Sequence, residues 1–181
     1  MKKIVLTITL ALIAAFTFAQ NNNPVGMRME VTEITQDNNE YSIFTYKDDD
    51  GTFGYYLSLG RVYRILEIIV NDRNSSTLDH ISETCLYLGT TADEAYDALE
   101  HLLDLLDQEP GTAVDIPCRL TNGSPTLTDS STATCIVVKR FFQRKRLCFL
   151  FTSGRHTAQV DLTRSALKSL RWNLKMAQKL N

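Results

Sequence analysis

The sequence lacks the short motifs that mark the common catalytic and cofactor sites. It contains no GxGxxG, phosphate-binding loop, HExxH, GxSxG or EF-hand pattern. Its four cysteines form no Cys-x-x-Cys pair, which weakens zinc and thioredoxin-like interpretations. With 44% hydrophobic and 22% charged residues, the composition excludes a wholly disordered chain, a collagen-like fibre and a multi-span membrane protein. We therefore predict no metal and no cofactor, and we favour a non-enzymatic protein over an enzyme.

Two local patterns hint at chemistry, and each has a simpler interpretation. Cys148 and His156 have the residue types of a nucleophile and its base, but no spacing requires them to meet, and Cys148 lies in an apolar run. The run Asp48-Asp49-Asp50-Gly51 lacks the alternating ligands and the distal glutamate of a calcium loop. Because two alternating runs flank it, this segment is typical of a hairpin turn.

The first twenty residues have the pattern of a secretory signal peptide. Two lysines begin it, an uncharged and mostly apolar run follows, and Ala19 precedes the expected cleavage site. The apolar run is shorter than the about 20 residues of a membrane span, so cleavage is favoured over an uncleaved anchor. We predict an exported protein, periplasmic or secreted, with no membrane span after cleavage. The expected segments are a signal peptide over 1–19, a polar leader over 20–26 and a single α+β domain over 27–181.

Period-two alternation predicts a chain rich in β-strands. Strands are expected over 27–34, 40–47, 52–59, 61–70, 82–88, 113–120, 133–142, 147–152 and 156–160. The segment 61–70 also fits a helix. Turn residues, including Asn122-Gly123-Ser124-Pro125, separate the later strands.

Two helices are predicted from their caps and apolar stripes. Thr91 and Glu94 have the spacing of a capping box. A second helix, capped by Asp161 or Thr163, runs to about Leu180. The order strands, helix, strands, helix predicts an α+β fold in which one antiparallel sheet carries both helices on one face. Because each half ends in a helix, we also hypothesise that the two halves are related.

Charge is distributed unevenly along the chain. Residues 20–115 hold five Lys+Arg and 19 Asp+Glu, a net charge of −14, whereas residues 116–181 hold 12 and two, a net charge of +10. The first helix has an acidic stripe of Asp93, Asp97, Glu100, Asp104 and Asp107. The second has a basic stripe of Arg164, Lys168, Arg171, Lys175 and Lys179. Either the stripes neutralise each other within the molecule, or the basic surface is offered to an anionic partner.

The candidate partner site lies in the basic half. A turn over 139–146 combines five cations with Phe141 and Phe142, and Trp172 stands beside the basic stripe of the second helix, away from its apolar face. Trp172 is therefore either buried on a second face or part of a contact patch. The simpler alternative is a solvated turn and a paired helix. The predicted anion-binding or partner-binding residues are Lys139, Arg140, Arg144, Lys145, Arg146, Lys168, Arg171, Lys175 and Trp172.

Export brings the four cysteines into an oxidising compartment. Cys118 and Cys135 lie on strands that flank a turn-rich stretch, and they face each other if the hairpin is centred near 126–127. A disulfide between them is then expected. Four small buried thiols are the alternative, since free cysteine is often a core residue.

We predict an exported, non-enzymatic binding or interaction module. The candidate partners of the basic half are an anionic glycan, lipid headgroups or an acidic protein surface, and export makes nucleic acid a poor candidate. Self-association of the acidic half with the basic half is also open, and salt would weaken it. The alternatives are a structural or self-assembling envelope protein and an enzyme without a recognisable motif.

Overall fold

The chain alternates blocks of antiparallel strands with single helices. The computed structural model describes residues 23–36, 39–63, 81–122, 126–127, 130–139, 143–153 and 156–179. The first block contains β1 (Arg28–Gln36), β2 (Asn39–Lys47), β3 (Phe53–Tyr63), β4 (Ile81–Gly89) and α2 (Ala92–Leu105). The second contains β5 (Ala113–Asn122), β6 (Ser131–Val138), β7 (Arg146–Ser153), β8 (His156–Thr163) and α3 (Arg164–Lys179). This order confirms the predicted α+β class.

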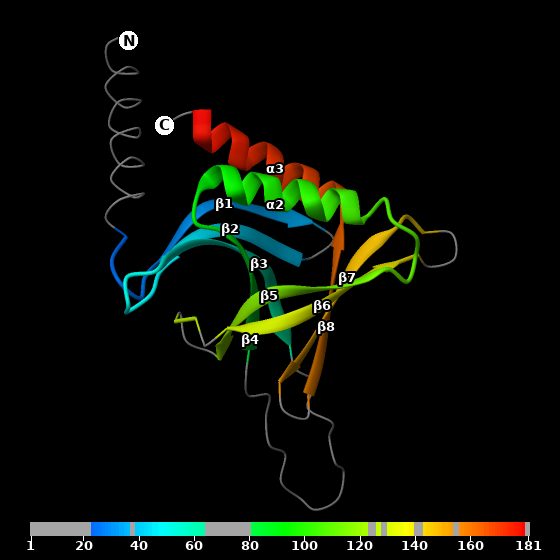
Figure 1. Ribbon diagram of the computed structural model, residues 1–181, viewed down its shortest axis with the longest axis horizontal. Coiled ribbons are helices and arrows are strands. Elements are labelled where there is room, and N and C mark those ends of the chain that lie inside the picture. The colour runs from blue at the N-terminus through cyan, green and yellow to red at the C-terminus, as the bar shows by residue number, and fades with distance from the viewer. Residues whose placement is uncertain are drawn as a thin grey trace, which may run out of the picture.

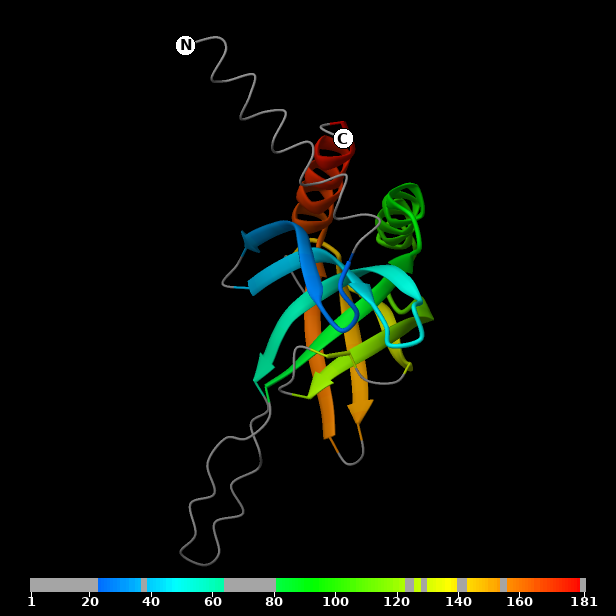
Figure 2. The same cartoon turned by 90° about the vertical axis from the view of Figure 1, so that its left-hand side faces the viewer.

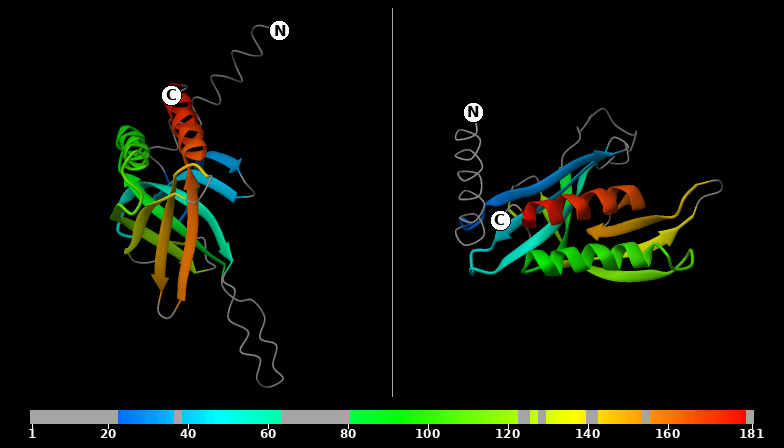
Figure 3. Two further views of the ribbon diagram at one scale, coloured as in Figure 1. Left: turned by 90° about the vertical axis from the view of Figure 1, so that its right-hand side faces the viewer. Right: turned by 90° about the horizontal axis from the view of Figure 1, so that it is seen from above.

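All eight strands belong to one antiparallel sheet, and they follow one another in sequence order from β1 to β8. The two helices lie side by side and antiparallel across one face of it (Figure 1 and Figure 3). The main hydrophobic core lies between the helices and the sheet. It takes buried side chains from both blocks, such as Leu57 and Leu99 from the first and Phe149 and Leu170 from the second. The helices therefore share one face and one core, as the hypothesis of related halves requires.

The sheet twists strongly, so that its last strand returns toward the first block (Figure 2). The Tyr41 hydroxyl on β2 donates a hydrogen bond of 2.9 Å to the backbone oxygen of Asp161 on β8, and β3 also contacts β8. Three register shifts in these strands add to the twist: the pairing of β1 with β2 shifts after Glu30, and that of β3 with β4 shifts after Tyr55 and again after Ser58. The shifts after Glu30 and Ser58 lie beside the pocket that is described below.

The segment between β2 and β3 forms the predicted hairpin turn. The Asp48 N–H donates to the backbone oxygen of Thr52 at 2.8 Å, and the Gly51 N–H donates to the backbone oxygen of Asp48 at 2.9 Å. Gly51 has a φ of +88°, which favours glycine at this position. The hydrogen bond from the Thr52 N–H holds the pKa of the Asp50 carboxyl below its usual value. The acidic run is thus a turn that the Asp50 side chain helps to close.

Both helices begin at threonine caps. The Thr91 hydroxyl accepts a hydrogen bond from the N–H of Glu94, and the Glu94 carboxylate accepts one from the Thr91 N–H, which completes the predicted capping box. Thr163, one of the two caps expected for α3, accepts from the N–H of Ala166 at 3.2 Å. Each helix therefore starts where a local side chain satisfies an N–H group that has no helical partner.

The register of β5 and β6 separates the expected disulfide partners. Cys118 lies opposite Ser131, and Cys135 lies opposite Val114. The prediction that Cys118 and Cys135 face each other is therefore wrong, because the connection is centred earlier than 126–127. All four cysteines are buried and outside any disulfide. Burial, together with the neighbouring Cys148, raises the pKa of the Cys135 thiol to about 12, so this residue is held as a neutral thiol.

Other expectations differ at segment ends or lie outside the described residues. The strand expected over 133–142 ends at Val138, and residues 61–63 continue β3, whereas 64–70 lie outside the described residues. The predicted signal peptide also lies outside them. Within the described part of the chain, no helix is both long and apolar enough to cross a membrane. The end of the polar leader is packed against β2, since the buried Asn23 amide donates to the Thr45 hydroxyl at 3.1 Å.

Candidate functional site

Side-chain contacts join α2 to α3 along their length. From one contact to the next, the residue number rises by seven on α2 and falls by seven on α3. Seven residues make about two helical turns, so antiparallel helices repeat the contact at this interval. The acidic and basic stripes therefore neutralise each other in part, which is the first of the two alternatives drawn from the sequence. The contacts join Asp93 to Gln178, Glu100 to Arg171, and Asp107 to Arg164.

Arg171 is held within the molecule on two sides. It forms the ion pair with Glu100, and its guanidinium lies 5.7 Å from the centre of the Tyr96 ring. The Lys175 ammonium lies 5.6 Å from the same ring, but the side chain stays exposed. Arg171 thus serves the contact between the helices, and Lys175 is available to a partner.

The predicted basic turn over 139–146 also has internal roles. The Lys145 ammonium donates to the backbone oxygens of Asp107 and Gln108 at 3.2 and 2.6 Å, in the turn just after the negative end of α2. Arg146 approaches Asp161 at 3.8 Å. Lys139 and Arg144 are exposed, whereas residues 140–142, including the predicted Arg140, lie outside the described residues. The turn is therefore partly tied to the end of α2.

The outer side of α3 carries an exposed row of Lys168, Trp172 and Lys175, here called the basic row. At 100° per residue these side chains point in nearly the same direction, opposite the buried leucines of the helix. Trp172 is 60% exposed, the largest fraction among the large apolar side chains described. Of the two alternatives for Trp172, the exposed contact patch is observed. No ion pair to Lys168 or Lys175 is formed within the described part of the chain.

The outer side of α2 carries a second exposed row, of Asp97, His101 and Asp104, here called the acidic row. It lies opposite the buried face of Leu99, Leu102 and Leu103. The helices lie side by side (Figure 3), so the exposed residues of the acidic and basic rows are neighbours on the outer surface of the helix layer.

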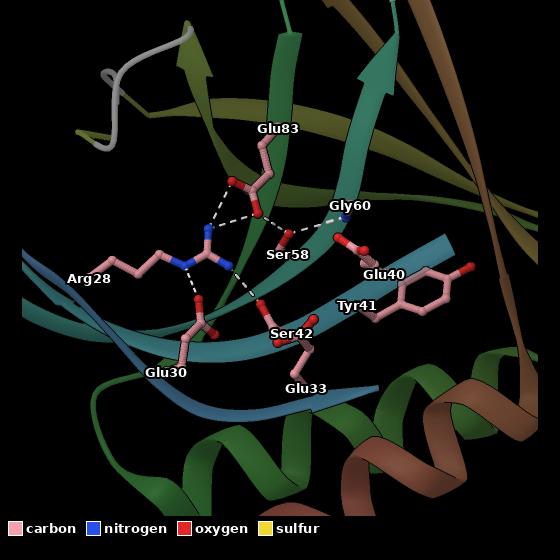
Figure 4. Close-up of a pocket in the computed structure, with 9 residues that line it drawn as sticks. All are labelled: Arg28, Glu30, Glu33, Glu40, Tyr41, Ser42, Ser58, Gly60 and Glu83. Carbon is pink, nitrogen blue, oxygen red and sulfur yellow. Dashed lines mark hydrogen bonds and ion pairs between the residues drawn. The ribbon is translucent and has the colours of Figure 1, made fainter. Parts of the chain in front are cut away.

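A pocket of about 310 Å³ opens on the other face of the sheet, away from the helices (Figure 4). Four glutamates and one arginine give its wall a negative charge. None of these residues carries a sequence signal for a site, since they are single polar positions on separate strands. Its lining comes from β1 to β4 and consists of Arg28, Glu30, Glu33, Glu40, Tyr41, Ser42, Ser58, Gly60 and Glu83.

Arg28 occupies the centre of this pocket. Its Nη1 donates to both carboxylate oxygens of Glu83 at 2.7 and 2.8 Å, its Nη2 donates to the Ser42 hydroxyl at 2.6 Å, and its Nε donates to Glu30. The guanidinium also lies 4.0 Å from the centre of the Phe44 ring. Burial alone lowers the pKa of Arg28, but the hydrogen bonds and charges of Glu83 and Glu30 outweigh it and raise the pKa. The cation is therefore neutralised within the protein.

Two further groups complete this network. The Ser58 hydroxyl donates to Glu83, and the Gly60 N–H donates to the Ser58 hydroxyl at 3.1 Å. Gly60 has a φ of +83°, and a Cβ atom at this position would lie 2.5 Å from the backbone oxygen of Glu40. The wall of the pocket thus requires glycine, and the network joins β1 to β3 and β4.

A second arginine forms a similar link on the same face. Arg119 on β5 donates to the Asp48 carboxylate at 2.6 Å and lies 5.9 Å from the centre of the Tyr46 ring. Burial alone lowers its pKa, but hydrogen bonds to Asp48 and Tyr56 outweigh it and raise the pKa. Asp48 belongs to the turn after β2, so the pair fixes that turn to β5. Both arginines act as structural links between strands.

Comparisons with family models, curated proteins and solved structures found no match to this chain. A proposal for the function of this protein therefore has to be drawn from its own charges and contacts. Of the predicted site residues, the structure brings Lys168, Trp172 and Lys175 together on one exposed surface. It gives Lys145, Arg146 and Arg171 partners inside the molecule.

Proposed function

We propose that the protein is a non-enzymatic interaction module whose basic row binds an acidic protein surface. The observation that carries the proposal is Trp172, which is 60% exposed between Lys168 and Lys175 on one side of α3. Tryptophan is enriched among the residues that dominate binding energy in protein interfaces. Flanking cations add charge complementarity, which speeds association and selects the partner.

The acidic row beside the basic row favours a protein as the partner. An anionic vesicle or a broad sulfated glycan surface would meet Asp97 and Asp104 together with the lysines, so repulsion would offset attraction. A protein surface can present acidic groups to the basic row alone. If the protein is exported as the sequence predicts, this partner lies in the periplasm or outside the cell. Export is part of the proposal.

A binding measurement with a narrow acidic probe tests the proposal. The purified protein is passed over an immobilised oligoglutamate peptide at low ionic strength, in surface plasmon resonance. We expect the double variant Lys168→Glu/Lys175→Glu to bind at least about tenfold more weakly, because attraction at two positions becomes repulsion. The matched control is Lys139→Glu/Arg144→Glu, which makes the same change in net charge at two exposed residues outside α3.

Equal loss of binding in the two double variants would show that net charge alone drives binding and would reject the site. Phosphatidylglycerol vesicles and a sulfated polysaccharide are tested in parallel. If either binds more tightly than the peptide and depends on Lys168 and Lys175, the partner is a lipid or a glycan and the proposed class is wrong.

A further inference from the structure

The two rows on the helix layer have matching spacing. The acidic row of Asp97, His101 and Asp104 has gaps of four and then three residues. The basic row of Lys168, Trp172 and Lys175 has the same two gaps in the same order along the chain. In both rows a ring side chain stands between two residues of one charge sign. The two surfaces are therefore candidates for direct pairing.

The antiparallel packing of the helices sets the level of each row along the common axis. The ion pair of Glu100 with Arg171 and that of Asp107 with Arg164 place residues of α2 and α3 at equal heights. The same register puts Asp97 within one residue of the height of Lys175, and Asp104 within one residue of that of Lys168, an offset of about 1.5 Å each. His101 lies within two residues of the height of Trp172, an offset of about 3 Å. All six side chains are exposed, and no ion pair joins the two rows within the described part of the chain, where the Lys175 ammonium lies beside the Tyr96 ring of α2. A second copy can therefore supply the counter-charges.

We propose that two copies of the chain dock through their helix layers, with the acidic row of each on the basic row of the other. The proposal rests on the proposed function and names its partner. A two-fold axis that runs parallel to the helices, midway between them, exchanges α2 and α3 and leaves every residue at its height. Asp97 then meets Lys175 of the second copy, Asp104 meets Lys168, and Trp172 meets His101. The contact is isologous, as in most symmetric dimers.

The charges select this axis over the other one. A two-fold axis perpendicular to the helices would lay α2 on α2, so Asp97 and Asp104 would face acidic residues of the second copy. Like charges that face each other across an interface are strongly disfavoured. The surface therefore specifies one arrangement through repulsion as well as attraction.

The size of the surface predicts a weak dimer. A helix rises 1.5 Å per residue and is about 10 Å wide, so the helix layer offers about 400–500 Å² per copy. The total of about 800–1,000 Å² lies below the range of stable specific interfaces and in that of weak, transient ones. We expect dimerisation that depends on protein concentration and is weakened by salt, because four exposed charge pairs and two ring contacts hold the copies together.

Sedimentation equilibrium of the purified chain and two charge-reversal variants tests the arrangement. Lys168→Glu/Lys175→Glu makes both rows acidic, and Asp97→Lys/Asp104→Lys makes both rows basic. Each variant alone should dimerise at least about tenfold more weakly than the original chain. An equimolar mixture of the two should dimerise again, because each basic surface then meets an acidic one. The control Glu33→Lys/Asp49→Lys makes the same charge change as Asp97→Lys/Asp104→Lys, on exposed residues outside the helix layer, and should dimerise normally.

Two results would overturn the dimer. One is a chain that stays monomeric at low salt at every concentration, and the other is a mixture of variants that associates no better than either alone. If Asp97→Lys/Asp104→Lys still binds the oligoglutamate peptide as well as the original chain, the proposed function stands without the dimer. If the basic row binds neither the peptide nor a second copy, both proposals fail. Circular dichroism of each variant verifies that the fold is intact.

Discussion

The pocket between β1 and β4 and the outer surface of the helices both bring opposite charges together, but they differ in burial. In the pocket, the side chains of Arg28 and Glu83 are 23% and 17% exposed, and each has further hydrogen-bond partners. On the helices, Asp107 is 68% exposed in its pair with Arg164. A buried charge that loses its partner is costly, whereas an exposed pair contributes little. The pocket network therefore stabilises the fold. The exposed charges on the helices contribute little to stability, and their main effect is on which partners the surface binds.

The largest expected effect comes from the pocket network. Glu83→Gln leaves the Arg28 guanidinium in a partly buried site without its main counter-charge. We expect the free energy of unfolding to fall by about 2–4 kcal/mol, measured by urea denaturation. The control is Glu33→Gln, which changes an exposed glutamate of the same pocket and should cost less than about 0.5 kcal/mol. Equal costs for the two variants would show that the network does not stabilise the sheet.

The next largest effect compares two glycines with positive φ. Gly60 and Gly51 have φ values of +83° and +88°, but only at Gly60 would a Cβ atom meet another atom within 4 Å, the backbone oxygen of Glu40 being the nearest. We expect Gly51→Ala to cost about 1 kcal/mol, from the backbone conformation alone. Gly60→Ala should cost about 3 kcal/mol, because close contact adds to the same strain. Similar thermal stability of the two variants would contradict the described geometry of the pocket wall.

The smallest effect is expected on the helices. A double-mutant cycle of Glu100→Ala and Arg171→Ala should give a coupling free energy of about 0.5 kcal/mol that falls with added salt. The reason is that both side chains are about one third exposed, so water screens their attraction. A coupling above about 2 kcal/mol would mean that the helix pairs support the fold as strongly as the pocket does, and the contrast between the two regions would disappear.

The elements that could be predicted from the sequence are those whose causes are local. Thr91 and Glu94 form their capping box within one helical turn, and Asp48 and Gly51 close a turn of four residues. The α+β class and the order of elements follow from the same local patterns. The sequence could not decide whether Trp172 is exposed or buried on a second face. A helical projection places it away from the leucines but does not show what lies beside it.

The parts that could not be predicted depend on contacts between distant segments. Arg28 meets Glu83 only because β1 and β4 lie in one sheet, and no spacing in the chain indicates this contact. The register of β5 and β6 could not be predicted either. A turn centred a few residues earlier pairs Cys118 with Ser131 instead of Cys135, although the alternation pattern of each strand is the same. Among the predicted cations, Lys145 and Arg171 have the same residue types as Lys168 and Lys175, and only packing assigns them to internal contacts.

The emission of Trp172 tests most directly whether the basic row is a contact surface, because this is the only tryptophan of the chain. We predict that its emission maximum moves to shorter wavelength as protein concentration rises at low salt, and that high salt or Lys168→Glu/Lys175→Glu reverses the shift. Burial of the ring against a second copy is the cause. An emission maximum that stays at the wavelength of an exposed indole at every concentration, and also in the presence of the oligoglutamate peptide, would contradict the account.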